Sequence, residues 1–147
     1  MTTEELIQNR KHLLQEYSHK YQQYFDGLLN DVTNGNDVND FLELTDKEQI
    51  ILVNYCLTAF RPINTINYHN TSYGLKHHFE HYPFGFYVSN GQFKAGMLLA
   101  GYLPKDKNIL NWCYAISENS PGDSWLEDSA CHWRKYYIPL DENEKRY

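Results

Sequence analysis

The stretch from residue 71 to residue 117 constrains the fold most, because helix and strand patterns follow one another there without long gaps. Residues 71–82 predict a short helix with a Thr-Ser cap, and residues 89–101 predict a second helix that ends at a glycine. Residues 86–88 predict a short strand between the helices, and residues 102–117 predict a β-hairpin with a polar turn. Helix, link, helix and hairpin are the order of a winged helix-turn-helix.

The longest helical pattern lies at the N-terminus, over residues 3–29. Thr2 and Glu5 have the spacing of a capping box at its start. Apolar residues recur close to a heptad period, in a row at positions 7, 14, 21 and 28. This row has two interpretations: a coiled-coil arm that forms a homodimer contact, or a helix that packs on its own domain.

A second capping box, Thr45 with Glu48, precedes Ile50–Phe60. This segment is apolar nearly all round, so we expect it to be the central buried helix. Residues 63–70 alternate imperfectly and predict a lead-in strand or an ordered loop. The sequence therefore predicts an α+β, helix-rich fold with a long N-terminal helix, a central buried helix and a winged helix-turn-helix-like module with a small β-hairpin.

The chain has 147 residues and is 41% hydrophobic, which fits one domain with a real core. We divide it into an N-terminal helical region (1–60), the winged-helix-like module (61–117) and an acidic aromatic C-terminal segment packed on the same domain (118–147). No apolar run approaches the ~20 residues of a membrane span, and the polar N-terminus is unlike a signal peptide. Three widely spaced cysteines predict reduced thiols, so we expect a cytoplasmic protein without membrane contact.

Charge is distributed unevenly along the chain. The formal net charge is −6, which disfavours binding to a bulk polyanion. Between residues 61 and 107, however, five basic residues against two acidic ones give +3, which leaves −9 for the flanks. Such an asymmetry concerns binding partners and says little about the fold.

Catalytic and metal-binding patterns are weak in this sequence. His77 and His81 are four apart and could share a metal, but no CxxC or HExxH motif accompanies them. Cys113 lies in NWCYAIS, on the face of a predicted strand that carries small residues, which favours packing over catalysis. Neither a nucleophile elbow nor a phosphate loop is present. We therefore predict no catalytic residues, no metal site and no cofactor.

A winged helix would contact nucleic acid through the polar residues of its two helices and its wing. The positive charges would meet phosphates, and the amide side chains at the start of the second helix could read base edges. The candidate residues are Lys76, His77, Asn90, Gln92, Lys94, Lys105 and Lys107.

Aromatic residues mark a different candidate surface in the C-terminal segment. The chain contains 13 tyrosines, and aromatic anchors are typical of protein interfaces. An acidic, aromatic surface can occupy a groove built for nucleic acid, although it can equally be an ordinary solvated face. The candidate partner-binding residues are Asp123, Trp125, Glu127, Asp128, Trp133, Tyr136 and Tyr137.

Three short segments carry a resemblance to a known group of proteins: Thr71–His77 (TSYGLKH), Phe86–Gly91 (FYVSNG) and Asn111–Ser117 (NWCYAIS). They resemble small proteins of largely unassigned role carried by phages, genomic islands and integrative elements of Gram-positive bacteria. The resemblance covers residues 61–117 and includes no catalytic residues. It implies an accessory protein of a mobile element, a class that includes regulators and anti-CRISPR inhibitors of host defence.

Two functional hypotheses follow. The first is a non-catalytic protein that binds and inhibits a host nucleic-acid-handling defence complex, in the manner of an anti-CRISPR protein. Its partner would be a host protein or ribonucleoprotein, such as a Cas9-type nuclease. The alternative is a winged-helix transcriptional regulator of a mobile element that binds DNA directly.

Overall fold

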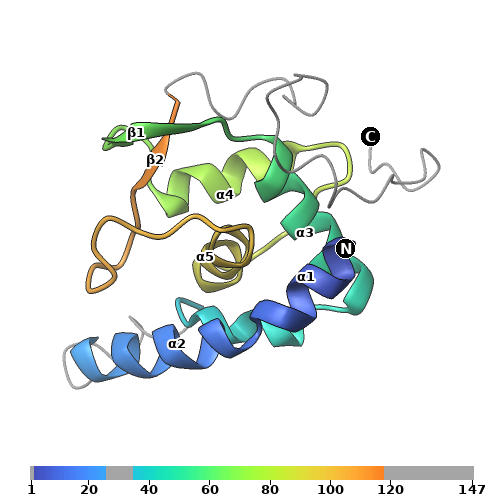
Figure 1. Ribbon diagram of the computed structural model, residues 1–147, viewed down its shortest axis with the longest axis horizontal. Helices are drawn as coiled ribbons and strands as arrows, with labels where there is room; N and C mark the ends of the chain where they lie inside the picture. Colours follow the sequence, from blue (N-terminus) through green and yellow to red (C-terminus); the bar gives the residue numbers. More distant parts are fainter. Residues whose placement is uncertain (1, 26–34, 118–147) are drawn as a thin grey trace.

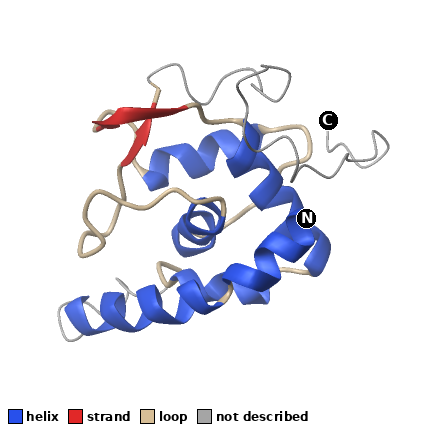
Figure 2. Ribbon diagram, viewed as in Figure 1, coloured by secondary structure: helices blue, strands red, loops and turns tan. Residues whose placement is uncertain are grey.

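The computed structural model describes residues 2–25 and 35–117 and combines helices with a small two-stranded antiparallel sheet (Figure 2). No helix in these ranges is long and apolar enough to cross a membrane. The elements follow in the order α1 (Thr3–Arg10), α2 (His12–Phe25), the 3-10 helix η1 (Val38–Glu43), α3 (Asp46–Thr58), β1 (Pro62–Asn67), α4 (Ser72–His81), α5 (Asn90–Leu99) and β2 (Tyr114–Ile116).

Helix α5 lies at the centre of the molecule, with α4 on one side and α1 and α2 on the other (Figure 1). It contacts η1, α3, α4, α2 and α1, and all its residues except Gln92 are buried. Gly96 permits the close approach of α3, because a Cβ atom at this position would lie 2.9 Å from Leu52 Cγ and 3.2 Å from Cys56 Sγ. The regions 1–60 and 61–117 therefore share one hydrophobic core.

Helix α3 is the second buried helix, as predicted from its apolar sequence. The capping box between Thr45 and Glu48 is present in both directions, with distances of 3.2 and 2.9 Å. From Ile51 to Phe60 every residue is buried. The Tyr55 ring packs edge-on against Phe60 and Phe79, which joins the end of α3 to α4.

The N-terminal pattern forms two helices, so the prediction of one long helix is not confirmed in the described part of the chain. The predicted Thr2–Glu5 capping box starts α1, which ends at Arg10. Arg10 Nη1 donates to Leu99 O at 2.8 Å and thus satisfies a carbonyl at the end of α5.

The first two residues of the heptad row pack inside the core of this chain. Ile7 and Leu14 are 2% and 0% exposed and belong to the common core, as the intramolecular interpretation expects. They are therefore unavailable for a homodimer contact, and positions 21 and 28 lie outside the described side chains.

The sheet differs from the predicted hairpin. Strand β2 pairs antiparallel with β1, in a register that joins Pro62 with Ile116 and Asn67 with Tyr114. Tyr102 is not in a strand, and its hydroxyl donates to Phe60 O at 2.9 Å, next to the end of α3. The expected β-hairpin wing between residues 102 and 117 is thus not confirmed, while the predicted lead-in strand is confirmed as β1.

The strand predicted at residues 86–88 is an extended loop in the structure. Its backbone finds a side-chain partner in place of a neighbouring strand, because Val88 N donates to Glu80 Oε2 at 3.2 Å. Glu80 lies on α4, so this bond holds the loop against that helix. The loop leads to Ser89, which is the N-cap of α5.

We predict that Leu52→Asp abolishes cooperative folding. Leu52 is 0% exposed and lies against Gly96, so a carboxylate there would be buried without a partner, at a cost of several kcal/mol. Thermal unfolding followed by circular dichroism measures this effect. Leu42→Asp is the matched control, because Leu42 is 45% exposed and should tolerate the charge. A cooperative transition in Leu52→Asp at the wild-type temperature would contradict this account of the core.

Candidate functional site

The candidate site is built at the N-terminal end of α5. Ser89 and Gln92 form a reciprocal capping box there, so the helix begins at a fixed position. Asn90 and Lys94 follow four residues apart and therefore project from the same face of the helix. Both are buried, although amide and ammonium groups are strongly hydrated in water.

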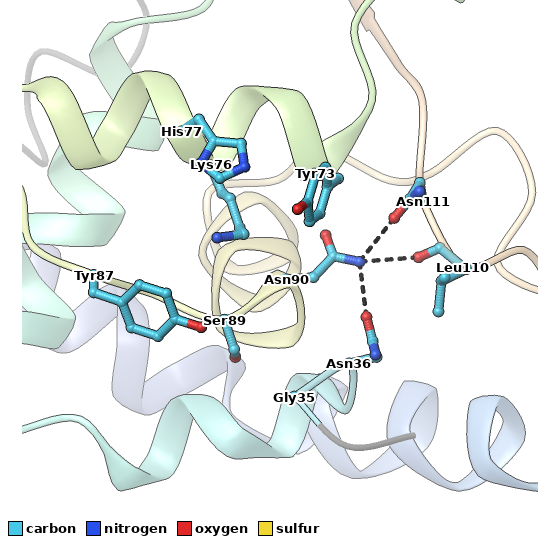
Figure 3. Close-up of a pocket in the computed structure, with 10 residues that line it drawn as sticks. All are labelled: Gly35, Asn36, Tyr73, Lys76, His77, Tyr87, Ser89, Asn90, Leu110 and Asn111. Atoms are coloured by element: carbon cyan, nitrogen blue, oxygen red, sulfur yellow. Dashed lines mark hydrogen bonds between the residues drawn. The ribbon is translucent and has the colours of Figure 1, made fainter. Parts of the chain in front are cut away.

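Asn90 joins two loop segments that are far apart in sequence. Its Nδ2 donates to Asn36 Oδ1 at 3.1 Å, to Leu110 O at 3.2 Å and to Asn111 Oδ1 at 3.0 Å (Figure 3). One side chain of α5 thus connects the segment before η1 to the segment before β2.

Lys94 connects the same two segments one turn further along α5. Its Nζ donates to Asn36 O at 3.4 Å and to Leu110 O at 3.1 Å, and it lies 4.4 Å from the centre of the Trp112 ring. Burial lowers the pKa of Lys94 from 10.5 to about 7, whereas the nearby carboxylate of Asp37 acts in the opposite direction.

Gly91 lets the segment before η1 lie directly against α5. A Cβ atom at Gly91 would lie 2.3 Å from Asp37 O and 2.7 Å from Asn36 C, which backbone atoms cannot accommodate. The Gly91 amide instead donates to Gly35 O at 3.0 Å. Glycine is therefore required here for a close approach of two backbones.

These contacts form the base of a pocket of about 490 Å³. Residues from α4 and from the loop before α5 make its other walls, as Figure 3 shows. Several side chains that line it can form hydrogen bonds, namely Asn36, Tyr73, His77, Ser89 and Asn111. The pocket thus gathers polar groups from four separate parts of the chain.

The α4 wall carries a cluster of charged and ionisable groups. Lys76 Nζ and His77 Nδ1 contact the two oxygens of Glu80, at 3.1 and 2.9 Å. Burial alone would raise the pKa of Glu80, but hydrogen bonds from Lys76, the Val88 amide and His77 outweigh it and lower this pKa below its usual value. Glu80 therefore stays ionised and holds both pocket-lining side chains in place.

Two exposed tyrosines stand at the pocket rim. Tyr73 is 52% exposed and Tyr87 is 74% exposed. The Lys76 ammonium lies 5.5 Å from the centre of the Tyr73 ring and 5.0 Å from that of Tyr87, so it contacts both π-systems. Aromatic rings at the edge of a polar pocket are typical of a binding site.

The structure removes three of the predicted contacts with duplex DNA from the protein surface. Lys94 is 0% exposed, so it cannot reach a phosphate. Lys76 and Asn90 are each 5% exposed and are occupied by Glu80 and by the two loop segments, respectively. The prediction is wrong for Lys94 because helical periodicity alone does not reveal that α5 is enclosed on every side.

The remaining predicted contacts do not form one patch with those three. Gln92 is half-buried and donates to Asp40 O at 3.2 Å. His77 is exposed at the pocket, Lys105 is exposed on the segment after α5, and Lys107 is half-buried. Sequence analysis missed Tyr73, Tyr87, Asn36 and Asn111, whose convergence depends on contacts between distant segments.

The predicted partner-binding residues Asp123, Trp125, Glu127, Asp128, Trp133, Tyr136 and Tyr137 lie outside the described residues. Within the described ranges, no group of three His, Cys, Asp or Glu side chains could hold a metal ion. His81 Nδ1 lies 2.7 Å from the carbonyl oxygen of His77, so one of its ring nitrogens is already engaged by the helix.

Comparison with known proteins gives no relative for this chain. No protein family matches it, and no curated protein or solved structure is significantly similar. The resemblance to mobile-element proteins therefore stays a prediction.

We predict that the free energy of unfolding rises between about pH 7 and about pH 8.5, by roughly 1 kcal/mol per pH unit. The pKa of Lys94 is about 7 in the folded chain and near 10.5 in the unfolded chain. In this pH window Lys94 therefore takes up a proton when the chain unfolds. Raising the pH makes this proton uptake less favourable, so the free energy of unfolding increases. Above this pH window the cysteine thiols of the unfolded chain lose protons, which lowers the free energy of unfolding.

Urea denaturation at a series of pH values measures this slope. Lys94→Met is the control, since it keeps a side chain of similar length and removes the titrating group. The increase of the free energy of unfolding with pH should be smaller in Lys94→Met by roughly 1 kcal/mol per pH unit. Equal increases in the two proteins would show that the Lys94 ammonium is solvated.

Proposed function

We propose that this chain is a non-catalytic binding protein that contacts its partner at the tyrosine-rimmed pocket and inhibits a host nucleic-acid-handling complex, in the manner of an anti-CRISPR protein. One observation carries the proposal. All three segments on which the resemblance to mobile-element proteins is based contribute to this pocket: Tyr73 and Lys76 from the first, Tyr87 and Asn90 from the second, and Asn111 from the third.

The environment of the described cysteines supports a binding role over nucleophilic catalysis. Burial raises the pKa of the Cys56 thiol well above its usual value and also raises that of Cys113. A thiol in such an environment stays protonated, whereas the thiolate is the nucleophile. Neither cysteine lines the pocket.

The position of α5 weighs against the alternative, a winged-helix regulator. A recognition helix must expose one face to the major groove. In this chain α5 exposes no such face, because Gln92 is its only residue that is not buried and contacts Asp40. The acidic net charge of −6 also fits a protein partner better than duplex DNA.

We predict that the purified protein inhibits DNA cleavage by a Cas9-type ribonucleoprotein at near-stoichiometric ratio and does not bind duplex DNA at low salt. Tyr87→Ala should weaken inhibition about tenfold, which corresponds to ~1.4 kcal/mol, and leave the melting temperature unchanged, since Tyr87 is 74% exposed.

Tyr68→Ala is the matched control, because Tyr68 is 65% exposed but does not line the pocket. It should inhibit like the wild type. Undiminished cleavage together with tight, salt-sensitive binding to duplex DNA would contradict the inhibitor and favour a regulator.

A further inference from the structure

The pocket contains a buried hydrogen-bond acceptor that has no donor among the described residues. Asn90 is 5% exposed, and its Oδ1 is enclosed without a partner. The Leu110 carbonyl can only accept, so the end of the amide that faces it is Nδ2, and an oxygen in that place would be repelled. A ligand with an N–H or O–H group would recover the free energy lost at this unsatisfied acceptor.

Tyr73 controls access to this acceptor. In Figure 3 the Asn90 oxygen is turned away from the two loop segments and toward the Tyr73 side chain. Tyr73 is 52% exposed, and its ring is held by an edge contact with His77 at 4.9 Å and by the Lys76 ammonium. A ligand that reaches this oxygen would have to displace the Tyr73 ring, which is half exposed to solvent.

The rim favours a flat ligand. Tyr73 and Tyr87 present exposed rings on either side of the Lys76 ammonium, so a planar ring can stack on an exposed tyrosine face. Stacking on aromatic side chains is the main way in which proteins hold unpaired nucleobases. The pocket, at about 490 Å³, is large enough for a nucleotide.

The charge of the walls disfavours a cationic ligand. No acidic side chain is among the described residues that line the pocket, whereas Lys76 and His77 both line it. Glu80 contacts these two side chains from α4 and is itself not a lining residue. Because Glu80 is already paired with Lys76 and His77, an arginine or lysine of a partner protein would find no acidic side chain among the described lining residues, while a phosphate would be tolerated.

We propose that this pocket binds a single unpaired nucleobase with an amino group, whose N–H donates to Asn90 Oδ1 while its ring stacks on the rim tyrosines. Adenine is the simplest such base, supplied either by a free nucleotide or by single-stranded nucleic acid. The inference rests on the proposed function, because it names what the same pocket would recognise in a nucleic-acid-handling complex.

Calorimetric titration of the full chain with AMP tests the proposal, with N6,N6-dimethyl-AMP and ribose 5-phosphate as matched probes. The dimethylated base keeps its ring but has no N–H, so it should bind about tenfold more weakly than AMP. Ribose 5-phosphate has no base and should not bind measurably. Equal affinities for AMP and the dimethylated nucleotide, or no binding of AMP at about 10 mM, would overturn the proposal.

Tyr87→Ala supplies the matching variant, because this exposed side chain can be removed without disturbing the core. AMP binding should weaken about tenfold or more in Tyr87→Ala and stay unchanged in Tyr68→Ala. Unchanged binding in Tyr87→Ala would overturn the stacking contact and with it the proposal. If a protein partner buries Tyr87 and no nucleotide binds, the pocket is part of the interface with that protein, and the base-binding proposal is overturned.

A single-stranded hexaadenylate distinguishes the two sources of the base. If the oligonucleotide binds more tightly than AMP, the base comes from single-stranded nucleic acid. If its affinity, expressed per nucleotide, equals that of AMP, the base comes from a free nucleotide. Nucleotide binding without inhibition of the nuclease would contradict the proposed function alone. Inhibition without nucleotide binding would contradict the base-binding pocket alone.

Discussion

The hydrogen bonds of the buried Lys94 side chain to two loop segments are the interactions on which the pocket depends. Removing an ammonium group from water is costly, and two backbone carbonyls and the face of Trp112 compensate for this in part, since burial still lowers the pKa of Lys94 to about 7. These three contacts come from the segments before η1 and before β2. Together with Asn90, Lys94 therefore fixes both segments to α5, and the walls of the pocket follow from their positions.

This arrangement explains why α5 is both a core helix and the base of the candidate site. Its apolar side chains pack against α3, η1 and α4, while Asn90 and Lys94 use the remaining face to bind loop backbone. Their hydrogen bonds satisfy loop carbonyls that no strand or helix would satisfy. Asn90 Oδ1 has no donor among the described residues, and this distinguishes the site from a hydrogen-bond network that only holds loops in place.

Local signals in the sequence predicted the parts of the fold that depend on neighbouring residues. The capping boxes at Thr2 and Thr45 and the buried helix after Thr45 are examples, because spacing of three or four residues determines them. Both strands of the sheet were predicted but their pairing was not, since β1 and β2 join residues about fifty positions apart.

The pocket could not be predicted for the same reason, because lysine and asparagine on an amphipathic pattern suggest an exposed face. The central claim is that Lys94 is a buried ammonium bound to the Asn36 and Leu110 carbonyls, and NMR of its ammonium protons near pH 6 tests this most directly. The account predicts slowly exchanging Nζ protons with nuclear Overhauser effects to residues 36–37 and 110–112. A rapidly exchanging ammonium with the shifts of a solvated lysine would contradict it.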